Sequence, residues 1–260
     1  CKVEWTLHDC WAFTGHCAHF TYAKCAQWKT HCAYSEERCP QLGAYPKTYS
    51  KTSCAWNFDQ KRRLFNLVPA GRMKLITPSQ WLSDLVAESF LSEYPVEVRR
   101  NTIDTSVFKP TPSDFRERYG IGDRFMVLGV ASPWTERKGL TDFVRLAEEL
   151  DSEKYAIVLV GLSEKQVKEM PAVIVGLART DSREELAGIY SAADVFFNPT
   201  VEDNYPTVNL EAEACGTPVV TYDAGGCAET VRRVDSCVVE GYEGAFKTLS
   251  ALSGPSLIDF

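Results

Sequence analysis

The chain has 260 residues, of which 45% are hydrophobic and 24% are charged, and its formal net charge is −7. A chain of this length buries roughly three quarters of the surface that its unfolded form exposes, so we expect a globular protein with up to two domains. No apolar run reaches the roughly eighteen residues of a spanning helix, which excludes an integral membrane protein. The negative charge argues against a nucleic-acid partner, because phosphate backbones are bound by clustered Lys and Arg.

The N-terminal part is rich in cysteine and histidine. The chain opens at Cys1 without a methionine and residues 2–7 already read as a strand, so we expect that its true N-terminus is missing. Residues 10–54 show little periodicity and are interpreted as a long ordered loop. Of the ten cysteines, seven precede residue 55, and the four histidines lie in the same region: His8, His16, His19 and His31.

Strand and helix patterns alternate after this loop. Residues 58–68 have helical character, residues 73–79 read as a strand, Ser79 is a plausible cap for a helix over 80–91, and residues 96–104 read as the next strand. Such alternation is typical of a parallel α/β layer. The sequence therefore predicts a partial α/β domain over residues 1–107.

A second α/β domain is predicted for residues 108–260, after a linker rich in Pro, Ser and Thr at 105–120. The expected strands are 125–131, 155–161, 172–177, 194–199 and 218–223, and the expected helices are 139–150, 182–193 and 206–216. The strands are continuous runs of Val, Ile, Leu and Phe, as in a sheet that helices cover on both faces. We predict two Rossmann-like, doubly wound domains in an α/β chain.

Two acids, Asp203 and Glu211, are separated by seven residues where a strand pattern gives way to a helix. In doubly wound sheets, ligands bind at the carboxyl ends of the strands, beside helix N-termini. A carboxylate accepts two hydrogen bonds from a vicinal diol, and with Pro206 near the first turn the N–H groups of Thr207 and Val208 can meet an anion. On spacing alone, a capped amphipathic helix with solvated acids is the alternative.

The stretch YSAADVFFNPTVEDNYPTVNLEAEACGTPVVTYDAGG, residues 190–226, closely resembles the donor-binding segment of glycosyltransferase family 4. The motifs LVG at 159–161, ERKG at 136–139 and the strand end WTLHD fit the same family. The resemblance implies a retaining enzyme of the type B glycosyltransferase fold that moves a hexose from a UDP- or GDP-sugar to a glycan or lipid-linked acceptor. The cysteine-rich stretch further resembles a bacterial branch involved in capsule, exopolysaccharide or lipopolysaccharide assembly.

The resemblance also implies roles for the acids and a histidine. Glu211 matches the acid that binds the nucleotide ribose, and Asp203 stands where the family has a glutamate beside the transferred sugar, a departure that the neighbouring Glu202 softens. His8 matches a histidine that lines the active site, so His8 and Asp203 are the catalytic candidates. No protein nucleophile is implied, because the family's favoured account is front-face attack, in which the donor phosphate accepts the proton of the acceptor.

The family holds the diphosphate with a pair of cations and no catalytic metal. Lys138 matches the second cation, whereas Ser132 stands in place of the first, for which Arg137 compensates. Two cations stabilise the charge that develops on the leaving diphosphate. The candidate donor-binding residues are Arg137, Lys138, Asn204, Tyr205, Pro206, Thr207, Val208 and Glu211.

The cysteine spacing favours a structural zinc site. Cys17, Cys25, Cys32 and Cys39 are separated by seven, six and six residues, and four thiolates suit tetrahedral zinc. Any of His16, His19 and His31 can replace one cysteine. Free thiols and disulfides stay open as alternatives, although nucleotide sugars point to a reducing cytoplasm, where disulfides are rare. We expect a cytoplasmic protein, with peripheral association at the inner face of the plasma membrane as a further expectation.

Two other functions stay open. A non-catalytic or fragmentary relative that binds without turnover would explain Ser132, Asp203 and the missing N-terminal part. The cysteine-rich loop as a protein-interaction module is supported by composition alone.

Overall fold

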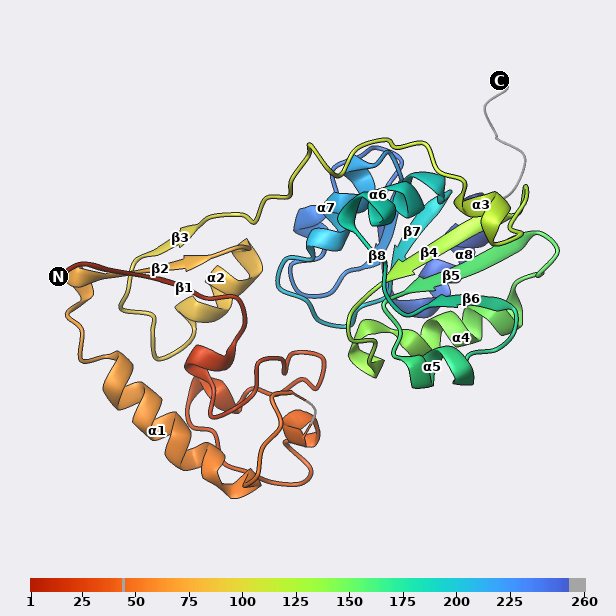
Figure 1. Ribbon diagram of the computed structural model, residues 1–260. Helices are drawn as coiled ribbons and strands as arrows, with labels where there is room; N and C mark the ends of the chain where they lie inside the picture. Colours follow the sequence, from red (N-terminus) through yellow and green to blue (C-terminus); the bar gives the residue numbers. More distant parts are fainter. Residues whose placement is uncertain (44, 253–260) are drawn as a thin grey trace. The chain divides into compact units, whose positions relative to one another are not determined.

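The chain folds into two compact units in the computed structural model, which describes residues 1–43 and 45–252 (Figure 1). Unit 1 comprises Cys1–Asn101 together with the short segment Glu202–Tyr205. Unit 2 comprises Thr102–Val201 and the chain from Pro206 onward. The chain therefore leaves unit 2 after Val201 and re-enters it at Pro206.

Unit 1 contains a parallel sheet in the order β1-β2-β3. Its strands are β1 (Val3–Thr6), β2 (Met73–Thr77) and β3 (Val96–Val98), and its helices are α1 (Cys54–Phe65) and α2 (Gln80–Ala87). Ser79 is the N-cap of α2, as its sequence position predicts, because its Oγ accepts the N–H of Leu82 at 3.1 Å. Strand β3 is shorter than the predicted strand over residues 96–104.

The stretch between β1 and α1 packs with β2 and α2 of unit 1 in one buried cluster. It is built of short 3₁₀ turns at Trp11–Phe13, Gln27–Lys29, Pro40–Gly43 and Lys51–Ser53. Phe13, Phe20 and Trp28 are buried together, with ring centroids 5.2–6.4 Å apart. Residues 10–54, of which the structure describes 10–43 and 45–54, thus share one core with the sheet of unit 1, and we call them the cysteine-rich segment.

Helix α1 fastens to this segment through a buried lysine. The Lys61 Nζ donates hydrogen bonds to the carbonyl oxygens of Trp11 at 2.6 Å and Thr14 at 3.0 Å. It also lies 3.4 Å from the centroid of the Trp11 ring. Burial lowers the pKa of Lys61 to about 8. The backbone carbonyls of an irregular turn are satisfied here by a side chain from a helix.

Unit 2 is a doubly wound sheet with the strand order β6-β5-β4-β7-β8-β9, every pair parallel. Its strands are β4 (Phe125–Val130), β5 (Tyr155–Val160), β6 (Ile174–Leu177), β7 (Val195–Asn198), β8 (Val219–Tyr222) and β9 (Cys237–Val239). The first five match the predicted strands. The order runs outward in both directions from the β4–β7 pair, which makes that pair the switch point of the sheet.

Helices cover both faces of this sheet (Figure 1). One buried cluster joins the strands to α3 (Phe115–Arg118), α6 (Arg183–Ala192) and α7 (Thr207–Ala214). A second cluster on the other face joins them to α4 (Leu140–Glu149), α5 (Glu164–Glu169) and α8 (Gly241–Leu252). In the described part of the chain, every helix is too short or too polar to cross a membrane.

Sequence patterns did not reveal α5, β9 and α8. Helix α5 had a readable signal, since Ser163 and Gln166 form a capping box around its first turn. Strand β9 has only three residues, with partly exposed side chains, so its apolar run is too short to distinguish from a loop.

Candidate functional site

The turns that follow β4 and β7 are bonded to each other at the switch point of unit 2. The Arg137 carbonyl accepts the N–H of Val201 at 3.0 Å and the Thr200 Oγ1 at 3.2 Å. Gly139 has φ 76°, and a Cβ there would lie 2.5 Å from Pro199 Cγ, so only glycine permits this approach. The sheet thus brings ERKG and the residues after β7 to one place, where ligands bind in doubly wound folds.

The predicted cations lie on a single short turn at this edge. Arg137 and Lys138 belong to the 3₁₀ turn Glu136–Lys138, and both are half-buried. Ser132 is exposed on the same connection. The arrangement places two positive charges at the carboxyl end of β4, where an anionic group can be met.

Helix α7 begins at the neighbouring strand end and is fixed there by buried amides. The Asn198 Nδ2 donates to Asn209 Oδ1 at 2.9 Å, and the Asn209 Nδ2 donates to Thr230 Oγ1 at 2.9 Å. Pro206 is the N-cap residue, followed by Thr207 and Val208. Since the first N–H groups of a helix have no acceptor within the helix, α7 directs those of Thr207 and Val208 toward its N-terminal end.

Glu211 lies in the middle of α7 and is half-buried. The Tyr190 hydroxyl donates to its Oε2 at 3.2 Å. Burial raises the pKa of Glu211 above its ordinary value of 4.5, against the opposing effects of the Tyr190 hydrogen bond and the Arg183 charge. Tyr190, which sequence reasoning missed, thus orients this carboxylate.

Four candidate residues belong to unit 1, namely His8, Asp203, Asn204 and Tyr205. Asn204 accepts the Ser79 hydroxyl on its Oδ1 at 2.6 Å and donates from its Nδ2 to the His8 carbonyl at 2.9 Å. His8 follows β1 and Ser79 follows β2, so Asn204 links two neighbouring strand ends. Tyr205 is buried, Asp203 is half-buried and His8 is exposed.

The structure therefore assigns the predicted site residues to both units. Unit 2 holds Arg137, Lys138, Pro206, Thr207, Val208 and Glu211, and unit 1 holds His8, Asp203, Asn204 and Tyr205. The roles given to these residues by the sequence stay predictions.

Glu202 does not soften the replacement of glutamate by Asp203, contrary to the expectation from the sequence. Its side chain is fully buried, and its two oxygens accept backbone N–H groups from Phe20, Thr21 and Tyr22. A carboxylate used in this way is not available to a sugar. No pattern signalled this contact, because the partners are separated by about 180 residues along the chain.

The four predicted zinc ligands share one core. Cys17 is buried in the apolar cluster of unit 1, and Cys25, Cys32 and Cys39 pack against it. The thiols of Cys25 and Cys54 act electrostatically on both Cys17 and Cys32. Cys54, at the start of α1, is therefore a fifth member that the spacing argument left out.

The thiols of Cys17 and Cys32 are protonated at neutral pH. Burial raises the pKa of Cys17 to about 11 and that of Cys32 to about 12, and all ten cysteines are free thiols. Across residues 1–43 and 45–252, no three His, Cys, Asp or Glu side chains are arranged to hold a metal ion. The zinc site stays a prediction, which would require the side chains to turn together and lose protons.

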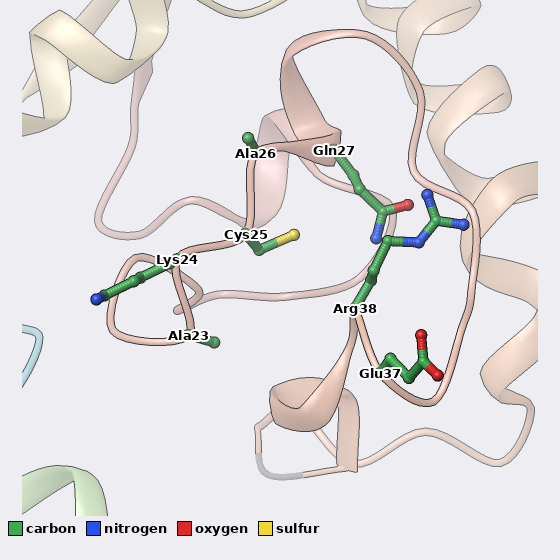
Figure 2. A pocket seen from close by; sticks show the side chains of 7 residues that line it. All are labelled: Ala23, Lys24, Cys25, Ala26, Gln27, Glu37 and Arg38. Atoms are coloured by element: carbon green, nitrogen blue, oxygen red, sulfur yellow. The ribbon is translucent and has the colours of Figure 1, made fainter.

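A hollow of about 470 Å³ opens beside Cys25. Figure 2 shows the Cys25 thiol pointing toward Gln27 and Arg38, whereas the Lys24 side chain points away. The Gln27 Nε2 donates to the Cys39 Sγ at 3.3 Å. The hollow is thus lined by Cys25, a predicted metal ligand, and by Gln27, which is hydrogen-bonded to the predicted ligand Cys39.

Comparison with protein families gives one match over much of unit 2. Residues 124–251 match the family described as glycosyl transferases group 1. The matched range contains the switch-point turns, α7 and Glu211.

Individual proteins give the same result. A D-inositol 3-phosphate glycosyltransferase of Salinispora arenicola is 29% identical over 60% of this chain and 41% of its own length. A putative colanic acid biosynthesis glycosyl transferase, WcaC of Escherichia coli, is 26% identical over 89% of this chain and 54% of its own length. The chain thus spans about half the length of these curated relatives.

Solved structures support the fold. The Anabaena protein Alr3699/HepE, crystallised with UDP-glucose, aligns with a TM-score of 0.59 at 22% identity, over 76% of this chain and 57% of its own. This similarity, together with the parallel sheets, establishes the α/β fold of the type B glycosyltransferases.

Proposed function

Since the chain belongs to the group 1 glycosyl transferases through residues 124–251, we propose that it serves as a retaining hexosyltransferase. The donor is a nucleoside-diphosphate sugar and the acceptor is a glycan or a lipid-linked glycan. The observation that carries the proposal is the switch point of unit 2, where the turn bearing Arg137 and Lys138 is hydrogen-bonded to the turn before α7. Doubly wound sheets bind nucleotides at this position.

Each part of the donor has a partner in the proposal. Glu211 accepts hydrogen bonds from the ribose diol, for which a carboxylate has the required pair of acceptor oxygens. Arg137 and Lys138 bind the diphosphate, and the N-terminus of α7 adds partial positive charge. Asp203 and His8 orient the transferred sugar, with Asn204 and Tyr205 holding the backbone beside it.

The chemistry is a substitution at the anomeric carbon of the hexose. The bond from that carbon to the diphosphate oxygen breaks, and a bond to the acceptor oxygen forms on the same face. The acceptor proton passes to the departing diphosphate, whose growing negative charge Arg137 and Lys138 stabilise. The proposal assigns no protein nucleophile and no catalytic metal.

The biological setting follows from the relatives. The Escherichia coli relative is named for colanic acid biosynthesis, and the Anabaena structure holds UDP-glucose. The first supports a role in cell-surface polysaccharide synthesis, and the second supports a nucleotide-sugar donor, for which we propose a UDP- or GDP-sugar. Because nucleotide sugars are cytoplasmic metabolites, we place the protein in the cytoplasm, with peripheral contact to the inner face of the plasma membrane and without a nucleic-acid partner.

A non-catalytic glycosyltransferase-like binding protein is the second candidate. The exposed Ser132 supplies no positive charge where the family pattern has an arginine, which favours weaker stabilisation of a leaving diphosphate. Such a protein would bind nucleotide without turning over a donor.

Calorimetric titration with UDP and GDP tests the donor site. We expect micromolar binding of one nucleotide, weakened at least tenfold, about 1.4 kcal/mol, by Glu211→Ala. Glu148→Ala, an exposed glutamate on α4, is the matched control and should bind like the wild type. Failure of a folded wild type to bind either nucleotide would refute the proposed function. Binding without transfer to any acceptor would favour the second candidate.

A further inference from the structure

The buried carboxylate of Glu202 occupies a ready-made backbone site in the cysteine-rich segment. Oε1 accepts the Phe20 N–H at 3.1 Å, and Oε2 accepts those of Thr21 at 2.7 Å and Tyr22 at 3.1 Å. His19 lies at the same site, with its Nδ1 3.8 Å from Oε1. Successive N–H groups that converge on one point form a cradle for an anion.

The cradle exists because residues 20–25 form a hydrogen-bonded turn. The Phe20 carbonyl accepts the N–H groups of Ala23 and Cys25, and the Thr21 carbonyl accepts that of Lys24. As at the start of a helix, the first N–H groups of such a turn have no acceptor inside it. Glu202 supplies that acceptor from a segment about 180 residues away in sequence.

Asn204, two residues after Glu202, is also held by hydrogen bonds within unit 1. Asn204 is bonded to the Ser79 hydroxyl and the His8 carbonyl, so it is tied to the ends of β2 and β1. Asp203 stands between two fixed neighbours and is the half-buried residue of the three. Its backbone position is therefore set from both sides, by the cysteine-rich segment and by the sheet of unit 1.

We propose that Glu202 is a positioning residue, which holds Asp203 in place through the amides of Phe20–Tyr22 and thereby sets the contribution of the sugar to donor binding. This role rests on the proposed function, in which Asp203 orients the transferred sugar. It also gives the cysteine-rich segment a task, namely to present the cradle that receives Glu202. Glu211 lies in unit 2 and does not depend on this anchor.

Titration with paired ligands tests the proposal on the whole chain. UDP, UDP-glucose, GDP and GDP-mannose are titrated into the wild type, Glu202→Gln and Glu202→Asp. Glutamine has nearly the same shape as glutamate, but its side-chain NH2 group would face the backbone N–H groups that Glu202 accepts. Because two donors cannot bond to each other, we expect sugar-nucleotide affinity to fall about tenfold. Affinity for the nucleoside diphosphate alone should change less than twofold. Aspartate keeps the charge and should recover part of the loss.

Leu91→Ala is the control for a general loss of stability in unit 1, because it removes a fully buried side chain from the core of that unit. It should leave the ratio of sugar-nucleotide to nucleotide affinity unchanged. Nuclear magnetic resonance provides a direct signature, because the amide resonances of Phe20, Thr21 and Tyr22 should shift together between the wild type and Glu202→Gln at one pH. In Leu91→Ala these three resonances should not shift together in this way.

The outcomes distinguish the two levels of the argument. Nucleotide binding with an unchanged affinity ratio in Glu202→Gln would overturn the positioning role alone, as would the same change of ratio in Leu91→Ala. Amide resonances of Phe20, Thr21 and Tyr22 that are unchanged in Glu202→Gln would also overturn it. A wild type that binds none of the four ligands would overturn the proposed function and the positioning role with it.

Discussion

Unit 2 and the cysteine-rich segment of unit 1 hold their backbones by opposite means. In unit 2 the strands pair in continuous register from β6 to β9, and helices bury both faces of the sheet. In the cysteine-rich segment, short backbone turns are supplemented by side chains from distant parts of the sequence, such as Lys61 on Trp11 and Thr14, and Glu202 on Phe20–Tyr22. We therefore expect single substitutions to affect the second arrangement more strongly than the first.

The largest expected difference in stability between the cysteine-rich segment and unit 2 concerns the removal of zinc from the predicted site. If the predicted site forms, native mass spectrometry should find one zinc per chain, and a chelator should unfold the cysteine-rich segment while unit 2 stays folded, because metal-binding energy is folding energy in such segments. Cys17→Ser should abolish the zinc, whereas Cys215→Ser, a buried cysteine of unit 2, should retain it. A metal-free wild type with unchanged stability would leave free thiols as the interpretation.

Gly15→Ala should break the cysteine-rich segment next most strongly. A Cβ at this position would lie 2.3 Å from the Cys54 carbonyl oxygen and 2.9 Å from the Cys32 Cβ. Overpacking against backbone typically costs about 1–3 kcal/mol. Denaturant unfolding followed by tryptophan fluorescence should report the loss, and Gly71→Ala, with open space around its Cβ, should not show it. Equal stability of the two variants would contradict the packing around Gly15.

Lys138→Met should sharpen the account of unit 2. Removing one of two cations at the carboxyl end of β4 should weaken UDP or GDP binding at least tenfold, since a hydrogen bond to a charged group contributes about 1.5–3 kcal/mol. Binding of the nucleoside without phosphates should not change. Lys165→Met, on the exposed side of α5, controls for net charge. An equal loss with the nucleoside would assign Lys138 another role.

The smallest expected effect is a shift in pH dependence at Glu211. Because burial raises its pKa above 4.5, protonation should weaken ribose binding at a higher pH than for an ordinary glutamate. The folded protein binds this proton more readily than the unfolded chain, so the same group makes the fold less stable as pH rises through that window. Nucleotide titrations at a series of mildly acidic pH values should show that the affinity of the wild type falls as the pH is lowered. In Glu211→Gln this pH-dependent fall in affinity should be absent.

Periodicity predicted most of unit 2. The buried strands β4, β5, β7 and β8 are continuous apolar runs, and the helices between them carry the 3.6-residue pattern, so their order along the chain indicated a doubly wound sheet. Ser79 was identified as a cap from local chemistry alone. Such features depend only on residues that are close together in the sequence, so they can be predicted from a single sequence.

Long-range side-chain contacts were not predictable. Glu202 looked like a spare acid beside Asp203, because nothing in the local pattern distinguishes a carboxylate that meets a substrate from one that binds a distant backbone turn. Cys54 was not among the predicted zinc ligands for the same reason. Folding brings it close to the other thiols, although it does not continue their regular spacing along the sequence.

The excursion of Glu202–Tyr205 into unit 1 has a consequence for synthesis on the ribosome. Unit 1 cannot fill its backbone cradle until the chain has been extended by about 180 residues beyond Tyr22. At synthesis rates of roughly 5–20 residues per second, Phe20–Tyr22 wait about 10–40 seconds for their carboxylate. During nascent-chain growth, the cysteine-rich segment is therefore exposed to chaperones, oxidants and metal ions for longer than unit 2.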